Sequence, residues 1–170
     1  MRIRFATESD LPAAMDIYAQ ARAFMEQTGN PTQWAGGYPQ EDMLRGDIAS
    51  SKLYVCEADD ADPRIVAAFY FGIEPDDTYK VIEGAWLREG DYGVVHRIAT
   101  ARDTRGVGSF CLEWAYGQAV LRGATAGIRI DTHADNTPMR NLLVKLGYAD
   151  CGVIYTFDGT PRIAFQKIPD

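Results

Sequence analysis

A glycine turn between a predicted strand and a predicted helix constrains the fold of this chain more than any other stretch. Residues 94–100 (V-V-H-R-I-A-T) are β-branched and apolar enough for a buried strand, and residues 109–121 have the length and repeat of a helix. The loop between them, residues 102–108, reads R-D-T-R-G-V-G. Because the first N–H groups of a helix lack intrahelical partners and the helix dipole adds positive charge there, this turn suits a phosphate.

The residue types in this turn fit anion binding. Gly106 and Gly108 let the backbone approach an anion closely. Arg102 and Arg105 can add charge-assisted hydrogen bonds to phosphate oxygens. A G-x-G at the start of a helix is equally compatible with a compact turn that binds nothing, so its meaning depends on the segments downstream of it.

A second strand and helix follow the first pair. Residues 127–133 (G-I-R-I-D-T-H) predict a strand, and the next segment predicts a helix with Thr137 as N-cap, Pro138 at the first helical position and Gly147 as stop. One apolar face of this helix consists of Met139, Leu142, Leu143 and Leu146. Two parallel strands joined through a crossover helix form a right-handed βαβ unit.

With these segments the chain resembles the GNAT superfamily of N-acetyltransferases, which use acetyl-coenzyme A. The resemblance covers nearly the whole chain and is strongest at residues 98–100 (I-A-T), 105–109 (R-G-V-G-S) and 136–148 (N-x-x-M-x-x-L-x-x-K-L-G-Y). It implies a single α/β domain over residues 1–170, an α+β mixed sheet of about seven strands with helices on both faces. The family's loop usually begins with Gln or Arg; here that position is Asp103, so Arg102 or Arg105 has to supply the charge.

The resemblance also implies how acetyl-coenzyme A binds as cosubstrate. Backbone groups of strand 98–100 would contact the pantetheine and offer an N–H to the thioester carbonyl, and the turn would hold the pyrophosphate. Asn136 would reach the pantetheine arm, and Lys145 would either meet a phosphate or be solvated. The expected coenzyme-binding residues are therefore Ile98, Ala99, Thr100, Arg105, Gly106, Val107, Gly108, Ser109, Asn136 and Lys145.

The proton chemistry departs from the family pattern. Many relatives carry a tyrosine two residues before the lysine of the second helix, but here that position is Leu143, which cannot donate a proton. The chain's only histidines, His96 and His133, fall on the two strands expected to flank the thioester, and His96 should share the face of Ile98 two residues later. A histidine on a sheet is also often structural. We predict His133 or His96 as base or proton carrier, with Tyr155 as a weaker acid candidate.

The resemblance places part of the acceptor site on the first pair of helices and their connection. Residues 28–39 are glycine- and proline-rich loop chemistry between these helices. The expected acceptor-binding residues are Asn30, Gln33, Trp34 and Tyr38, with Trp86 from the less regular stretch 75–92. Trp34 could instead only fill the gap between two helices, and Trp86 could be one buried indole in a solvated loop.

The remaining segments complete the sheet and its helices. Strands are predicted at residues 2–6, 52–57, 64–73, 150–158 and 161–167, with hairpin turns at A-D-D-A-D-P and D-G-T-P. A first helix should run from Leu11 to about Gln27 behind Ser9 or Asp10 as cap, and a second from Pro39 to about Ile48.

Composition excludes several classes of function. A net charge of −7 argues against a nucleic-acid or anionic-membrane partner, which needs a basic face. Three widely spaced cysteines fit neither a disulfide framework nor zinc-ligand pairs, so no metal site is expected. The N-terminus has no apolar signal core and no run approaches the roughly 18 apolar residues of a membrane span, so we expect a soluble, cytoplasmic protein, with a homodimer as an option common in the family.

The sequence leaves competing functions. The leading one is an N-acetyltransferase that moves an acetyl group from acetyl-coenzyme A to a primary amine of a small molecule or a protein. The missing tyrosine favours a rival, a non-catalytic sensor that binds acyl-coenzyme A. A generic ATP- or NAD-binding domain is disfavoured, because the chain has no G-x-x-x-x-G-K-[ST] and no G-x-G-x-x-G after a strand.

Overall fold

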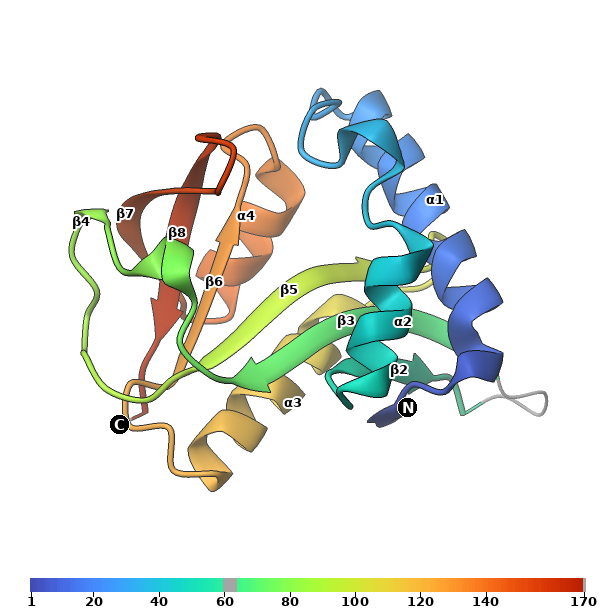
Figure 1. The fold of residues 1–170 in the computed structure, drawn as a ribbon, viewed down its shortest axis with the longest axis horizontal. Coiled ribbons are helices and arrows are strands. Elements are labelled where there is room, and N and C mark those ends of the chain that lie inside the picture. The colour runs from blue at the N-terminus through green and yellow to red at the C-terminus, as the bar shows by residue number, and fades with distance from the viewer. Residues whose placement is uncertain (60–63, 170) are drawn as a thin grey trace. The chain divides into compact units, whose positions relative to one another are not determined.

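The computed structural model describes residues 1–59 and 64–169 (Figure 1). Within these residues, eight strands hydrogen-bond into one mixed sheet in the order β1-β2-β3-β5-β6-β8-β7-β4. The chain clusters into two compact units. The first unit comprises Met1–Phe71 and His96–Cys111, and the second comprises Gly72–Val95 and Leu112–Asp170. The predicted α/β class with a mixed sheet is confirmed, with one strand more than expected.

The first unit is built on an antiparallel strand trio and two helices. The central strand β2 (Leu53–Glu57) pairs with β1 (Arg2–Phe5) and with β3 (Ile65–Ile73), which confirms the predicted hairpin, although residues 60–63 of its turn lie outside the described residues. The helices α1 (Leu11–Gln27) and α2 (Glu41–Ala49) pack against each other, and α2 also packs against β2 (Figure 1). The second helix thus begins two residues later than predicted.

The core of the first unit follows the helical repeat of α1. Leu11, Ala14, Ile17 and Tyr18 are buried on one side of this helix, as the spacing of its apolar residues predicts. Leu44 of α2 packs into the same hydrophobic cluster. The helix is entered through a short 3-10 turn, η1 (Glu8–Asp10), which has a capping box between Thr7 and Asp10. Asp10, rather than Ser9, is the N-cap residue of α1, although its side chain bonds Thr7 and not the helix.

A buried ion pair ties β1 to the start of α1. Arg4 donates from Nη1 and Nη2 to Asp10 at 2.7 and 2.9 Å, and its Nε reaches Glu57 at 2.7 Å. Hydrogen bonding to Arg4 lowers the pKa of Asp10 to about 2, and hydrogen bonds from Thr7 lower it further against the opposing effect of burial.

This ion pair predicts an acid-sensitive contribution to stability. Because the folded-state pKa of Asp10 lies below the unfolded value of 3.8, its contribution is complete above about pH 4 and is lost as the pH falls toward about 2. The free energy of unfolding, measured by urea denaturation, should therefore fall over this range in the wild type. In Asp10→Asn it should be lower at neutral pH and change less between pH 4 and pH 2. Parallel pH profiles of the two proteins would contradict the assignment.

The second unit contains the C-terminal strands and most of the last two helices. Strand β8 (Pro161–Lys167) pairs antiparallel with β6 (Ile128–Thr132) on one side and with β7 (Ala149–Tyr155) on the other. The start of β5 (Gly93–Thr100) pairs with β6 in parallel, which confirms the predicted parallel pair. The helices are α3 (Val107–Leu121), which begins in the first unit, and α4 (Thr137–Lys145) (Figure 1).

A glycine permits the chain to enter β6. Gly127 has a φ of +71°, and a Cβ atom there would lie 2.0 Å from the Lys167 carbonyl oxygen. The backbones at the start of β6 and the end of β8 therefore approach too closely for any side chain.

The stretch 75–92, left unassigned by the sequence, is ordered by contacts within the second unit. It holds a 3-10 turn, η3 (Asp77–Tyr79), and a two-residue strand, β4 (Glu83–Gly84), which pairs with β7 and is the additional strand. The buried Arg129 guanidinium lies 4.1 Å from the ring centroid of Trp86 and 4.2 Å from that of Tyr92. The Trp86 indole N–H donates to the Tyr79 carbonyl at 3.0 Å, so this residue anchors the segment.

The predicted cap of α4 is wrong by one residue. Asn136, not Thr137, is the N-cap, because its side-chain oxygen accepts the N–H of Met139 at 3.3 Å. Gly147, with a φ of +81°, ends the helix as predicted. None of the helices within the described residues combines the length and apolarity needed to cross a bilayer.

Candidate functional site

The predicted phosphate turn lies in the first unit, between β5 and α3. The first helical hydrogen bond of α3 runs from the Phe110 N–H to the Gly106 carbonyl at 3.0 Å, so the amides of residues 107–109 precede the helical ladder. Gly106 has a φ of +75°, and a Cβ atom there would find no heavy atom within 4 Å. The turn therefore combines a helix start, whose first amides precede the helical hydrogen bonds, with open space beside Gly106.

The turn is accessible along most of its length. Arg105 and Gly106 are exposed and Gly108 and Ser109 are half-buried, whereas Val107 alone packs into the interior. A hydrogen bond stabilises the start of the turn, because the Thr104 hydroxyl donates to the Ala101 carbonyl at 2.6 Å. Thr104 and the buried Val107 thus hold the turn in place, while Gly106 remains exposed.

Some of the charged residues beside the turn bond to other side chains, whereas Arg105 is exposed to solvent. Arg64 donates to both carboxylate oxygens of Asp103 at 3.3 and 2.8 Å, so the acidic residue at the family's usual Gln or Arg position is neutralised. Arg102 hydrogen-bonds Gln27 at 3.2 Å and lies over the Phe24 ring, which ties it to α1. Arg105, with its exposed side chain, is the arginine placed to meet a phosphate.

Strand β5 is irregular at Arg97. This residue has a φ of +52°, a left-handed conformation that is uncommon for any residue but glycine. The His96 ring lies 5.6 Å from the Tyr70 ring, and the Arg97 guanidinium lies 5.0 Å from the same ring. The side chains of two consecutive residues, His96 and Arg97, therefore both lie near Tyr70. The regular alternation of side chains along a strand is interrupted here, so the expectation that His96 and Ile98 share a face does not hold.

Sequence reasoning missed the partners of Arg97. Its Nη2 lies 2.5 Å from the Asp47 carboxylate on α2, and its Nη1 donates to the Tyr38 hydroxyl at 3.4 Å. Burial raises the pKa of Asp47 above its usual range, against the lowering effect of Arg97. Asp47 and Arg97 lie in a helix and a strand that are far apart in the sequence. No sequence pattern indicates that two such residues form an ion pair, so this contact could not be predicted.

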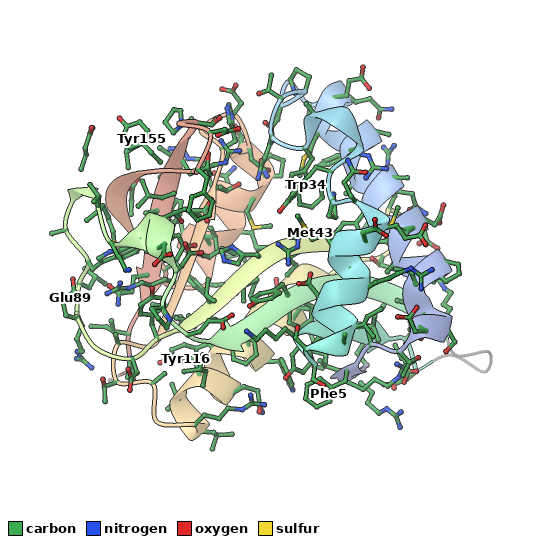
Figure 2. The ribbon with its side chains drawn as sticks, in the orientation of Figure 1. Phe5, Trp34, Met43, Glu89, Tyr116 and Tyr155 are labelled. Carbon is green, nitrogen blue, oxygen red and sulfur yellow. The ribbon has the colours of Figure 1, made fainter. Side chains whose placement is uncertain are left out.

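The predicted acceptor residues line the connection between α1 and α2. Trp34 packs edge-on against Tyr18 with ring centroids 5.7 Å apart and belongs to the hydrophobic core, so it fills the gap between the helices (Figure 2). Asn30 is only 1% exposed and donates to the Gln33 side chain at 2.7 Å. Gln33 and Tyr38 are half-buried and reach the surface of this connection.

His133 lies in the second unit, immediately after β6. The backbone N–H of Asp135 donates to its Nδ1 at 3.2 Å, and the Asp135 carboxylate lies 3.5 Å from the same nitrogen. Because Nδ1 accepts a hydrogen bond, a neutral ring carries its proton on Nε2. In this tautomer Nε2 of His133 is a hydrogen-bond donor.

Comparison with known proteins identifies the family to which this chain belongs. The model described as "Acetyltransferase (GNAT) family" matches residues 11–148, which include parts of both units. The chain belongs to the GNAT acetyltransferase family. No curated protein matches this GNAT chain.

Solved structures agree with this membership. A GNAT-family acetyltransferase from Streptococcus agalactiae is 32% identical, with a TM-score of 0.80, over 99% of this chain and 95% of that one. A GNAT-family acetyltransferase from Listeria monocytogenes shares the fold at 18% identity and a TM-score of 0.73, covering 99% and 94% of the two chains. The ribosomal-protein-alanine N-acetyltransferase from Brucella melitensis shares it at 21% identity and a TM-score of 0.63, covering 99% and 100%.

Two residues of this GNAT protein bear on where a proton donor could come from. Leu143, at the position where many relatives carry tyrosine, is fully buried in α4 and serves the core. Tyr155 is exposed (Figure 2). Its hydroxyl donates to Glu83 at 3.0 Å, and this bond raises the pKa of Tyr155. A raised pKa makes a tyrosine a weaker acid, so the structure supplies no readily ionised hydroxyl at either position.

The predicted residues of the GNAT site divide between the two units. The first unit holds His96, the segment 98–100, the turn 105–109 and the acceptor residues Asn30, Gln33 and Trp34. The second unit holds His133, Asn136, Lys145, Tyr155 and Trp86. Asn136 is buried and caps α4, whereas Lys145 is exposed near the end of that helix. One unit therefore contains the turn, the strand segment, a histidine and the acceptor connection.

Proposed function

We propose that this GNAT protein transfers an acetyl group from acetyl-coenzyme A to a primary amine of a small molecule or a protein. The observation that carries the proposal is the glycine turn at residues 105–109, which starts α3, exposes Arg105 and Gly106, and has open space beside Gly106. Bound acetyl-coenzyme A would supply the activated thioester. Residues of this chain would bind the diphosphate and the pantetheine, and would remove the proton from the amine.

The turn fits the diphosphate of the coenzyme. The amides of Val107, Gly108 and Ser109 would donate to its oxygens, and Arg105 would add a charge-assisted bond. The pairing of Asp103 with Arg64 supports this assignment, because the arginine offsets part of the repulsion that the carboxylate would exert on a phosphate.

The strand segment before the turn would bind the acyl-bearing arm. Ile98 and Thr100 are half-buried, so their backbone groups are candidates for contact with the pantetheine. A backbone N–H held near the thioester carbonyl would stabilise the negative charge that develops on its oxygen, an effect of several kcal/mol in enzymes that use such donors.

The acceptor amine has to lose a proton before it attacks. An amine with a pKa of about 10.4 is neutral in only about one molecule in 2,500 at pH 7. We assign proton removal, directly or through water, to His96, because it lies in the same unit as the turn and on the same strand as residues 98–100. His133, whose Nε2 is a donor when Nδ1 accepts from Asp135, is the second proton carrier.

The amine would enter beside the connection of α1 and α2. Gln33 and Tyr38 are the residues of this connection whose partial exposure suits direct contact. Trp34 would shape the site from the core, since it is only 8% exposed.

A second function is favoured by one observation. The buried Leu143 replaces the tyrosine that donates a proton in many relatives, which would suit a sensor that binds acyl-coenzyme A without reacting. This alternative keeps the turn and needs no proton carrier.

A two-step assay tests the proposal. Acetyl-coenzyme A should raise the melting temperature of the protein, because a ligand selective for the folded state stabilises it by about 2.7 kcal/mol at a hundred times its Kd. Release of coenzyme A thiol should then require an amine from a panel of diamines, amino acids and N-terminal peptides. Binding without amine-dependent thiol release would favour the sensor. Stabilisation by ATP or NAD without any by the coenzyme would overturn both functions.

A further inference from the structure

We propose that Asp47, Arg97 and Tyr70 are positioning residues that hold the imidazole of His96 in one orientation for proton transfer. The inference rests on the proposed function, since it specifies how the assigned proton carrier is held. All four side chains lie in the first unit and come from three elements, α2, β3 and β5.

The backbone at Arg97 creates the arrangement. In a regular strand, neighbouring side chains point to opposite faces, so only one of His96 and Arg97 could meet Tyr70. The left-handed φ of +52° at Arg97 interrupts this alternation and brings both to the same ring. A non-glycine residue stays in this conformation where its surroundings impose it, and such outliers cluster at functional sites.

The surroundings that impose it are an ion pair with little access to water. The Arg97 and Asp47 side chains are 12% and 13% exposed and meet at 2.5 Å. Separating them would leave a charge buried without compensation, which is far less favourable than keeping the pair. The Arg97 guanidinium therefore ties the middle of β5 to α2.

Tyr70 transmits this constraint to His96. The guanidinium lies over the Tyr70 ring at 5.0 Å, where cation–π attraction holds the ring, and the Lys52 ammonium lies 5.9 Å from the same centroid. The His96 ring rests against Tyr70 at 5.6 Å with an interplanar angle of 42°. A proton carrier held in this way loses less freedom when the amine binds, which is the advantage of a positioned catalytic group.

The test compares two ion pairs in the same unit. Asp47→Asn, Arg97→Gly and Tyr70→Leu each remove one positioning group, and glycine at position 97 keeps the left-handed backbone. Each variant should lower kcat by about tenfold to a hundredfold while the KM for acetyl-coenzyme A stays within about twofold. Asp10→Asn disrupts the Arg4–Asp10 pair and is the matched control, for which lower stability but unchanged kcat is expected.

A second readout does not depend on activity. The chain has two histidines, so its imidazole NMR signals can be assigned with His96→Gln and His133→Gln. The positioning variants should shift the His96 signals, through the changed ring current of Tyr70, and leave those of His133 in place. Variants that fold and bind the coenzyme but keep wild-type kcat and wild-type His96 signals would overturn the proposal. If no amine is acetylated by the wild type, the proposed function fails, while the His96 signals still decide whether the three residues orient the ring.

Discussion

Replacing Gly106 with valine should raise the Kd for acetyl-coenzyme A by about a hundredfold or more. Two effects combine. A β-branched residue at a φ of +75° carries about 1–3 kcal/mol of backbone strain, which displaces the neighbouring amides. Its side chain also enters the open space in front of the turn, and each charge-assisted hydrogen bond lost with the diphosphate costs about 1.5–3 kcal/mol. Isothermal titration with acetyl-coenzyme A measures the change directly.

Gly123 provides a matched control for this experiment. It has a φ of +83°, and a Cβ atom there would also find no heavy atom within 4 Å, but it lies in the turn after α3. Gly123→Val should therefore show a similar loss of thermal stability with unchanged coenzyme affinity. If both variants bind the coenzyme as well as the wild type, the turn does not hold the diphosphate.

Removing the histidines should abolish most of the turnover while sparing coenzyme binding. His96→Ala should lower kcat by about a hundredfold or more, the usual contribution of a positioned base, and His133→Ala should lower it as a proton carrier. Neither side chain belongs to the turn at residues 105–109, so the Kd for acetyl-coenzyme A should stay close to that of the wild type. Steady-state kinetics with the best amine of the panel, together with titration calorimetry, separate the two quantities.

Chemical rescue sharpens this second prediction. Imidazole added to the buffer should restore part of the turnover of His96→Ala, because a free base can occupy the space left by the side chain. It should have no effect on Gly106→Val, whose defect is in binding. Full turnover in both histidine variants would rule out the assigned proton carriers.

The glycine turn at residues 105–109 could be predicted because its structure is local. A glycine with a positive φ, the start of a helix and the preceding strand are properties of about fifteen consecutive residues, and the structure places Gly106 in that conformation. The chain also encoded the helix over residues 11–27 through the spacing of its apolar residues, and α1 has these bounds. Local propensity and periodicity were sufficient for these elements.

The surroundings of His96 could not be predicted in the same way. The expected shared face of His96 and Ile98 assumed a regular strand, and nothing in V-V-H-R-I-A-T marks Arg97 as left-handed, since glycine would be the usual sign. The two-residue strand β4 was likewise missed, because it is too short to show a pattern and exists through its pairing with β7.

By itself the sequence determined the family, the order of strands and helices apart from β4, and the glycine turn proposed to receive a diphosphate, because each of these depends on neighbouring residues. The tertiary structure decided which side chains meet. In the folded chain, Arg97 pairs with Asp47, which lies 50 residues earlier. Asp103 forms an ion pair with Arg64, and Trp34 is buried in the hydrophobic core. Contacts of this kind depend on burial and charge compensation between distant segments, and the free energy that selects them appears only when those segments pack together.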